Sequence, residues 1–504
     1  MLLWGLGLPL GLAAWFGWGW ALIESLRGRW QRHLLPVAWT GAFFLWQSIG
    51  FTKAMRYQLP IYPMLAMFAA WGLWEGWKRS RELPGRAGIW GPRAVAAAGL
   101  LVVGLTAAWA FAFHSIYRQP FSRAEASRWI YRHIPGVVNL VIDVGDDEYL
   151  EVIPMPQDFI LHPEAVHIVE ITTDLTGEVR EIWIPYAQAP HPPGGEAELE
   201  VTLTSEPDSG DLYARVAGHK MLGAGQETEF RMQLATPLPV DPERRLFLNL
   251  KNQGGTAIAM RGSVLVHETS WDDGMPWGLE GRNLNGRYEV RNLELYWHDD
   301  QDDDQNSVPD KIERIAASLE QGEYLIISSN RQYGTIPRVT IRYPLTTAYY
   351  RALFGCPEPQ PVLVCGARLE VGEHQGQLGY ALFQVFESHP SLGSLEINDQ
   401  FAEEAFTVYD HPKVLIFRKQ SDFKRERVEA ILGQVDVSRV QHVLPKDAGG
   451  PAPKDLMLPE ARWQQQQAAG TWSALFDPAS WIHRSTAVTV VAWWLAIGLL
   501  GLLM

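Results

Sequence analysis

The sequence predicts a multi-span α-helical membrane protein with a large exported α/β domain, into which an antiparallel β-sandwich (jelly-roll-like) is inserted. Three observations predict this fold class. The first 117 of the 504 residues contain four long apolar segments. The same residues carry ten Lys and Arg against three Asp and Glu, whereas the remainder of the chain carries 33 against 54. In this acidic remainder, the apolar residues change from a mixed helix and strand pattern to period two and back.

Four transmembrane helices are expected at about residues 2–22, 34–51, 61–77 and 94–117, and a fifth at 485–504. Each segment is long enough, or nearly so, to cross a hydrocarbon core about 30 Å thick. Tryptophans lie near the segment ends, where their rings sit at headgroup level. The alternatives are a buried core and, for the first segment, a signal peptide, but the chain begins Met-Leu-Leu-Trp without a basic n-region.

The basic residues of the short loops predict the orientation of these helices. Loops one and three carry eight Lys and Arg, whereas loop two carries two, Lys53 and Arg56. Because Lys and Arg are enriched in cytoplasmic loops, loops one and three are placed in the cytoplasm. The expected location is the cell membrane, multi-pass, with residues 118–484 extracytoplasmic and the lipid bilayer as a partner. The acidic body excludes nucleic acid as a partner, because a phosphate backbone requires clustered basic residues.

The exported body is predicted to have four parts before the last helix. They are an α/β segment at residues 118–196, a β-sandwich at 197–290, an α/β segment at 291–443 and a tether rich in Pro, Gly and Gln at 444–480. Alternation of apolar and polar residues, as in Leu199, Val201 and Leu203, predicts the sandwich strands. Ser122 and Glu125 have the spacing of a capping box and predict the start of a helix.

Further elements follow from short apolar patterns in both α/β segments. Helices are expected at 307–320, with Ser307 as N-cap, and at 422–435. Strands are expected at 137–144, 324–328, 383–386, 406–408 and 414–417. The last two strands would be joined by a turn through Asp410, His411 and Pro412.

Cys356 and Cys365 are the two cysteines of the chain. A disulfide can persist in an exported body, and the eight residues between them fit a small loop or hairpin. The alternative is a pair of buried free thiols. Two cysteines without clustered histidines do not indicate a zinc site.

A basic pair lies between the second and third predicted helices, in the sequence Lys-Ala-Met-Arg-Tyr-Gln-Leu-Pro-Ile-Tyr-Pro. Lys53 and Arg56 are three residues apart and would project from one side of a helical turn. Arg can fork onto phosphate oxygens while Lys supplies a mobile charge, so the pair suits a lipid-linked phosphate. The alternative is that both side chains only snorkel to headgroups.

This stretch resembles the K-x-x-R-Y-x-L-P-x-x-P signature of GT-C glycosyltransferases of family 39, the lipid A aminoarabinose transferase and protein mannosyltransferase type. The resemblance covers roughly residues 1–117. It implies a polyprenyl-phosphate sugar donor, whose phosphate Lys53 and Arg56 would hold with Tyr57 nearby, and a surface acceptor. The chain departs from the family, which has many more membrane helices and a catalytic acid in the first outer loop. No residue is therefore assigned a catalytic role.

The body resembles exported regions beside transferase-like modules in large membrane proteins of Chloroflexi. The resemblance rests on Ser-Arg-Trp-Ile-Tyr at 127–131, Ser-Ser-Asn-Arg-Gln-Tyr at 328–333, Arg-Tyr-Pro-Leu-Thr-Thr at 342–347 and Phe-Thr-Val-Tyr-Asp-His-Pro-Lys-Val at 406–414. The last predicted helix looks like the first helix of the YYY-type membrane family. The chain is therefore expected to be the middle of a longer polypeptide.

A dense acidic run contains Asp300, Asp302 and Asp304 at alternate positions, as in the oxygen ligands of a calcium loop. A divalent cation is the candidate cofactor of this run. Gln305 stands where such a loop needs glycine, and Lys311 stands where it needs a glutamate. The alternative is a solvated loop before a helix.

Trp271, Asp272, Asp273 and Trp277 combine aromatic rings with carboxylates, which suits a bound sugar. A packed edge of the sandwich would use the same residue types. Two functions are therefore expected. The first is part of a membrane glycosyltransferase that takes sugar from a polyprenyl-phosphate donor on the outer face, without its catalytic N-terminal portion. The alternative is a non-catalytic, membrane-anchored surface protein whose exported domain binds glycan or a protein partner.

Overall fold

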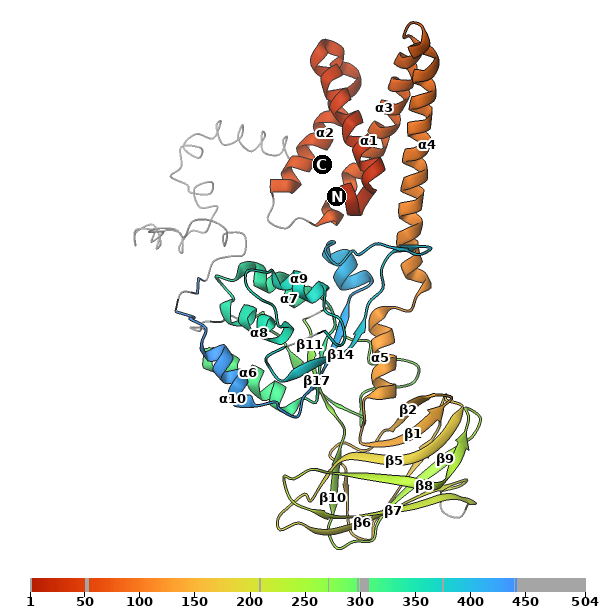
Figure 1. The fold of residues 1–504 in the computed structure, drawn as a ribbon, viewed down its shortest axis with the longest axis vertical. Coiled ribbons are helices and arrows are strands. Elements are labelled where there is room, and N and C mark those ends of the chain that lie inside the picture. Colours follow the sequence, from red (N-terminus) through yellow and green to blue (C-terminus); the bar gives the residue numbers. More distant parts are fainter. Residues whose placement is uncertain are drawn as a thin grey trace, which may run out of the picture. The chain divides into compact units, whose positions relative to one another are not determined.

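The computed structural model describes residues 2–49, 54–207, 210–270, 272–296, 299, 308–373, 376–438 and 440–441. Along the chain, a group of helices is followed by a β-sandwich and then by a mixed sheet with its helices (Figure 1). The tether and the fifth transmembrane helix predicted at 444–480 and 485–504 lie outside the described residues.

The amino-terminal part is helical. Its elements are η1 (Leu2–Leu6), α1 (Leu8–Glu24), η2 (Ser25–Arg29), α2 (Trp30–Ile49), η3 (Met55–Ile61), α3 (Tyr62–Arg81), α4 (Arg86–His114) and η4 (Ser115–Arg118). Ile61, Leu65 and Ala69 pack against Leu6 and Ala14, so the start of α3 is held against α1 by a small apolar core.

One helical stretch among the described residues, Arg86–His133, is long and apolar enough to cross a membrane, judged by length and composition. The prediction of a multi-span membrane protein is therefore wrong. The helices extend beyond the apolar segments, and polar residues enter them. α1 has 17 residues, α2 includes Arg32 and His33, and α3 carries four charged side chains in its last two turns.

Two antiparallel sheets form the β-sandwich. Its strands are β1 (Val138–Val144), β2 (Asp147–Ile153), β3 (Ile160–Leu161), β4 (Val166–Ile171), β5 (Gly177–Gln188), β6 (Gly195–Thr204), β7 (Leu212–Leu222), β8 (Thr228–Val240), β9 (Leu246–Asn252) and β10 (Ile258–Arg261). One sheet has the order β2-β1-β5-β10-β3, with β8 also paired to β5, and the other has the order β4-β9-β6-β7. In β6, Leu199, Val201 and Leu203 are buried between the sheets while the residues between them face outward, as their alternation predicts.

The sandwich occupies residues 138–261 rather than 197–290. The first α/β segment was expected to contain β1, but β1 pairs antiparallel with β2 and β5. β1 lacks alternation because both of its faces are covered. Leu140 and Ile142 belong to the sandwich core, whereas Val141 packs with the apolar side chains of α5 (Ser122–His133). A strand that is buried on both faces has a continuous apolar sequence, and this pattern does not predict which strands pair with it.

A five-stranded mixed sheet follows, with the order β12-β11-β13-β17-β14. Its strands are β11 (Val264–Glu268), β12 (Glu289–Leu293), β13 (Tyr324–Ile327), β14 (Tyr380–Phe386) and β17 (Val414–Lys419). β12 and β13 both run parallel to β11, whereas β17 is antiparallel to β13 and β14. A short hairpin joins β15 (Ser391–Leu392) and β16 (Leu395–Glu396).

Helices cover both faces of this mixed sheet. The later helices are α6 (Val308–Gln321), α7 (Arg331–Thr335), η5 (Ile336–Val339), α8 (Pro344–Phe354), α9 (Val362–Ala367), η6 (Ala405–Asp410) and α10 (Arg425–Gly433). Leu353 of α8 and Leu432 of α10 share a core with Leu325 of β13. On the other face, α5 places Ile130 in a core that includes Leu265 of β11 and Val141 of β1. α5 therefore packs against both the mixed sheet and the sandwich.

Two local predictions differ from the structure. Ser122 is the first residue of α5 rather than its N-cap, and its hydroxyl donates to Pro412 O at 2.5 Å instead of to the helix. Residues 406–408 form part of the helical turn η6 rather than a strand. The guanidinium of Arg123 bonds Val408 O, and the ring of Phe406 lies 5.4 Å from that of Phe113. Tertiary contacts thus override the strand propensity of this apolar triplet.

Candidate functional site

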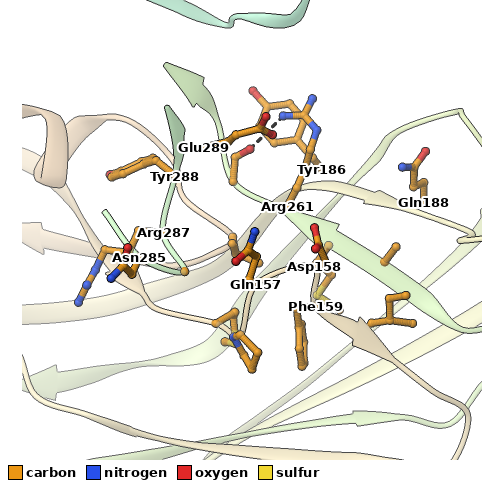
Figure 2. A pocket seen from close by; sticks show the side chains of 18 of the residues that line it. Gln157, Asp158, Phe159, Tyr186, Gln188, Arg261, Asn285, Arg287, Tyr288 and Glu289 are labelled. Carbon is orange, nitrogen blue, oxygen red and sulfur yellow. Dashed lines mark hydrogen bonds between the residues drawn. The ribbon is translucent and has the colours of Figure 1, made fainter. Parts of the chain in front are cut away.

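A cleft of about 900 Å³ opens between the sandwich and the segment that enters the mixed sheet, and we call it the sandwich cleft. This volume lies in the range of small-molecule sites. Most of its lining comes from four segments, namely the turn before β3, the end of β5, the end of β10 and the residues that lead into β12. Figure 2 shows Gln157 and Asp158 in the middle of the cleft, between Arg261 and Phe159.

Main-chain hydrogen bonds fix the walls of the sandwich cleft. The amide of Met155 donates to Gly286 O at 2.9 Å, and the amide of Met260 donates to Phe159 O at 3.0 Å. Gly286 has a φ of +70°, and a Cβ atom there would lie 2.0 Å from Met155 O. Only glycine allows this approach, because it has no Cβ and tolerates positive φ. The cleft is therefore formed by the fold before any ligand arrives.

Arg261 of β10 has all of its donors occupied at the edge of the cleft. Nε and Nη2 bond the carboxylate of Glu227 at 2.5 and 2.7 Å, and Nη2 and Nη1 bond that of Glu323 at 3.1 and 3.2 Å. Nη1 also donates to Gly262 O at 2.9 Å. Burial disfavours the charge, but the two carboxylates outweigh burial and raise the pKa of Arg261. The guanidinium lies over the ring of Tyr186, 4.1 Å from its centroid.

Four polar side chains in the sandwich cleft make no hydrogen bond or ion pair with any other residue that the structure describes. They are Gln157, Asp158, Gln188 and Asn285. Asp158 has a φ of +52°, a region that non-glycine residues rarely adopt and that concentrates at functional sites. Three amides and one carboxylate offer donors and acceptors to a ligand.

A second group of polar residues lies at the carboxyl ends of β11 and β13, and we call it the strand-end cluster. It consists of Arg123, Asp272, Asp273, Ser329, Arg331 and Tyr409. The chain leaves β11 toward β12 on one side and leaves β13 toward α7 on the other. Such a switch point at the carboxyl ends of parallel strands is the usual place for ligands in open α/β sheets.

Asp273 is buried at the centre of the strand-end cluster. Its Oδ1 accepts hydrogen bonds from Thr269 Oγ1 at 2.9 Å and from the amide of Ser270 at 2.7 Å. Its Oδ2 accepts from Ser329 Oγ at 2.7 Å. The carboxylate therefore joins the loop after β11 to the loop after β13, and both of its oxygens are occupied.

The remaining charges of the strand-end cluster also neutralise one another. Asp272 pairs with Arg331 at 2.9 Å and accepts from the hydroxyl of Tyr409 at 2.7 Å. Arg123 reaches across from α5 and donates to Ser328 O at 3.1 Å. Burial lowers the pKa of Arg123, although the nearby Asp273 opposes this shift. The ion pairs and hydrogen bonds of the cluster therefore connect α5, the ends of β11 and β13, and η6.

Two ionisable residues at the end of β11 are held neutral near pH 7. Burial raises the pKa of Glu268 to about 8, while a hydrogen bond from Tyr350 opposes part of the rise. Burial lowers the pKa of His267 to about 4. Their uncharged forms remove the cost of burying an unpaired charge beneath the strand-end cluster.

The predicted sugar-binding residues are separated by the structure. Asp272 and Asp273 belong to the strand-end cluster, and Trp271 lies outside the described residues. Trp277 packs its ring edge-on to His267 at 5.5 Å, and its carbonyl accepts from the hydroxyl of Tyr131 at 2.6 Å. The described members are engaged in packing, and none of them lines the sandwich cleft.

The basic pair predicted to bind a donor phosphate is described in part. Lys53 lies outside the described residues, whereas Arg56 and Tyr57 are exposed on η3. The pKa of Arg56 is raised, first by its hydrogen bond with Tyr57 and also by the negative charge of Glu403. The guanidinium lies 5.4 Å from the centre of the Tyr57 ring. A role in phosphate binding stays a prediction.

The predicted metal site at Asp300, Asp302 and Asp304 lies outside the described residues. The neighbouring Asp299 is buried and pairs with Lys311 at 2.6 Å, and its Oδ2 accepts from the amide of Leu345 at 2.6 Å. Lys311, which takes the place of a calcium-binding glutamate, thus neutralises Asp299. The described part of the chain contains no group of three or more His, Cys, Asp or Glu that could hold a metal ion.

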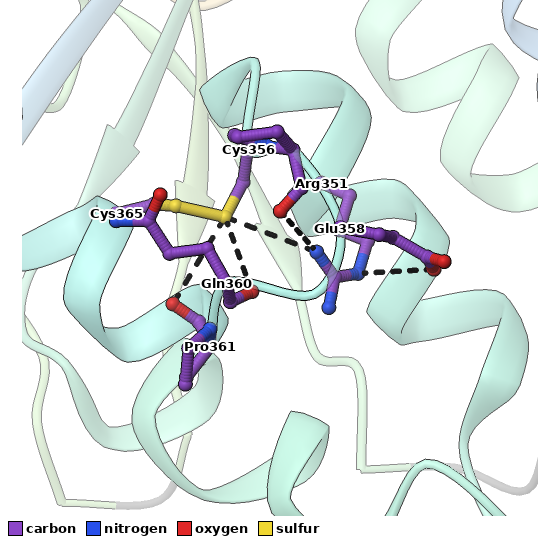
Figure 3. The surroundings of a disulfide bond; sticks show 7 residues. Arg351, Cys356, Glu358, Gln360, Pro361 and Cys365 are labelled. Atoms are coloured by element: carbon purple, nitrogen blue, oxygen red, sulfur yellow. Dashed lines mark hydrogen bonds and ion pairs between the residues drawn. A yellow bond between two sulfur atoms is a disulfide. The ribbon is translucent and has the colours of Figure 1, made fainter.

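Cys356 and Cys365 are joined in a disulfide, so of the two states considered the structure has the bridge (Figure 3). The bond links the end of α8 to α9, and Cys356 Sγ lies 3.7 Å from Gln360 O inside the loop. Arg351 of α8 donates to Pro357 O at 3.1 Å and pairs with Glu358. The bridge and these contacts close a short loop against the α/β core.

No protein-family model and no curated protein matches this chain. Among solved structures, an arabinose-bound α-L-arabinofuranosidase aligns with 27% of this chain and 23% of its own, at 11% identity and a TM-score of 0.14. A family two carbohydrate esterase from Cellvibrio japonicus aligns with 32% of this chain and 51% of its own, at 10% identity and a TM-score of 0.13. The chain thus spans about a quarter and about half of their lengths. Scores this low carry no argument about function.

Sequence reasoning missed the residues of the sandwich cleft. Gln157, Asp158, Gln188 and Asn285 are spread over 129 positions and form no local motif. The available signal was the Pro-Gln-Asp sequence of residues 156–158, in which Pro and Asp favour a turn and Asp tolerates positive φ. Its neighbours in space could not be derived without the pairing of β3, β5 and β10.

Proposed function

We propose that this protein is a glycan-binding protein and that the sandwich cleft is its binding site. The observation that supports the proposal is a preformed cleft in which three amides and one carboxylate have no partner among the described residues. Planar amide and carboxylate groups supply donors and acceptors in fixed directions, which match the alternating hydroxyls of a sugar. Gln157, Asp158 and Asn285 are exposed in the cleft and Gln188 is half-buried, so water can occupy these groups in the free protein and a polar ligand can replace that water.

Attachment to a bilayer is a second part of the proposal. α4 exposes Leu100, Leu101, Val103 and Phe111, each with 60% or more of its surface accessible. Exposed apolar area of this kind favours contact with lipid. Flotation of the full-length protein with phospholipid vesicles tests this part, and a protein that stays in the soluble fraction would contradict it.

Binding of a glycan array by the full-length protein, followed by calorimetry on the best ligand, tests the function. Gln157→Ala and Gln188→Ala should each weaken binding about fivefold, because each removes a hydrogen bond worth about 1 kcal/mol. Gln119→Ala is the matched control, since Gln119 is exposed and does not line the cleft. Absence of binding across the array, or equal affinities for all three variants, would overturn the proposal.

A further inference from the structure

We propose that the sandwich cleft selects neutral sugars over acidic sugars, such as chains that contain uronates. This inference rests on the proposed glycan binding and concerns which sugar the same cleft accepts. It follows from how the charged residues around the cleft are paired. Acidic sugars are normally recognised by an arginine that forks onto the carboxylate, so the state of each arginine at the cleft decides the preference.

Arg261 cannot supply such a fork. Its five N–H groups donate to Glu227, Glu323 and the carbonyl of Gly262. A guanidinium has five donors, so none remains for a ligand. A sugar carboxylate could bind Arg261 only by displacing Glu227 or Glu323, and Glu323 is also held by a hydrogen bond from the amide of Val264 at 2.7 Å.

Arg287 is turned toward the protein backbone. Its Nε donates to Val152 O at 3.0 Å and its Nη1 donates to Asn283 O at 3.2 Å. Figure 2 shows its side chain directed away from Gln157 and Asp158. Burial lowers the pKa of Arg287, which Glu151 partly opposes, so this guanidinium is already short of solvation. Its role is to hold the loop that forms one wall.

The charges that remain give the cleft a negative field. Asp158, Glu227, Glu289 and Glu323 are four carboxylates around Arg261, Arg287 and Arg291, the last of which pairs with Glu289 at 2.6 Å. The carboxylate without an ion pair among the described residues is that of Asp158, in the middle of the cleft. A like charge placed within several ångströms of it is repelled, whereas a sugar hydroxyl can donate to it.

The test measures the affinity of the full-length protein for a neutral oligosaccharide and for the same chain with one uronate. The neutral chain should bind about tenfold more tightly at low salt, because an unpaired like charge opposes the uronate. High salt screens this repulsion and should bring the ratio of the two affinities closer to one. Equal or tighter binding of the uronate chain would overturn the selection for neutral sugars and leave glycan binding standing. Binding of neither chain would count against the proposed function itself.

Two variants test whether the charges in the cleft, rather than its shape, determine the preference for neutral sugars. Asp158→Asn should bring the ratio of the two affinities toward one, because it removes the like charge that opposes the uronate, while any loss of a hydrogen bond to a sugar hydroxyl weakens both chains alike. Asp146→Asn, at an exposed residue outside the cleft, is its control and should leave the ratio unchanged. Glu227→Gln should raise the affinity for the uronate chain about fivefold, because it frees donors and charge on Arg261. An unchanged ratio in both Asp158→Asn and Glu227→Gln would also overturn the inference.

Discussion

The sandwich cleft and the strand-end cluster contain the same kinds of residue and differ in how those residues are paired. In the strand-end cluster, Asp273 has both oxygens occupied and Asp272 is shared by Arg331 and Tyr409. In the sandwich cleft, Asp158 and three amides have no partner in the described part of the chain. Residue type alone therefore does not distinguish the two regions. The pairing of each polar atom does.

The largest expected difference concerns the two aspartates. Asp273→Ala should lower the free energy of unfolding by about 4 kcal/mol, because it leaves the hydroxyls of Thr269 and Ser329 and the half-buried amide of Ser270 without their charged acceptor. Asp158→Asn should change it by less than about 0.5 kcal/mol, since asparagine also tolerates the positive φ and the change removes no hydrogen bond or ion pair among the described residues. Urea denaturation of both variants checks the contrast. A comparable loss in both would erase the distinction between the two regions.

The second prediction concerns the pH dependence of stability near the strand-end cluster. His411 lies two residues after Tyr409 and is buried between Asp399 at 2.5 Å and Asp410 at 3.0 Å. Burial disfavours its charge, but these carboxylates outweigh burial and raise its pKa to about 9. His389 on Asp399 and Tyr117 on Asp410 complete the surroundings.

Because the folded pKa of His411 lies above the unfolded value of about 6.5, its contribution is complete below pH 6.5 and is lost as pH rises through 9. The loss should be roughly 3 kcal/mol. Unfolding midpoints between pH 6 and pH 10 measure it, with His411→Asn as the reference that lacks the titration. Parallel pH profiles for the two proteins would show that His411 does not carry the effect. Ligand binding at the cleft should not follow this profile.

The smallest expected effect concerns the disulfide. Replacing both Cys356 and Cys365 by Ser should lower the free energy of unfolding by about 2 to 3 kcal/mol, as expected from loop-closure entropy for a loop of this length. Glycan affinity should stay unchanged, because no residue of the bridged loop lines the cleft. Reduction of the unmodified protein is the control and should give a similar loss. A fall in affinity would show that the two regions are coupled.

Parts of the fold followed from local sequence patterns. Alternation predicted β6, and short apolar runs predicted β13, β14 and β17 close to their observed bounds. The sheet to which β1 belongs could not be derived, because its apolar run is equally compatible with a parallel and an antiparallel neighbour. The multi-span prediction failed because it counted apolar segments, whereas the helices continue into charged residues such as Lys78 and Arg79.

The candidate site was less accessible to sequence reasoning than the fold. Asp272 and Asp273 were predicted to bind sugar because they lie near tryptophans in the sequence. In the structure, Asp272 pairs with Arg331 and Asp273 accepts a hydrogen bond from Ser329. Gln188 and Asn285 have no neighbours in the sequence that mark them, and Gln157 has only the adjacent Pro and Asp of a turn. Partner-free polar groups can be recognised only when the partners of all other groups are known, and that knowledge requires the three-dimensional pairing.

The close approach of Gly286 to Met155 O has a consequence for how the cleft can change over generations. Any side chain at position 286 would collide with Met155 O on the opposite wall. Single substitutions at this position therefore cannot change the spacing of the walls. The amides at positions 157, 188 and 285 carry no such constraint. New ligand preferences are therefore expected to arise by substitution of these three side chains while the backbone of the cleft stays the same.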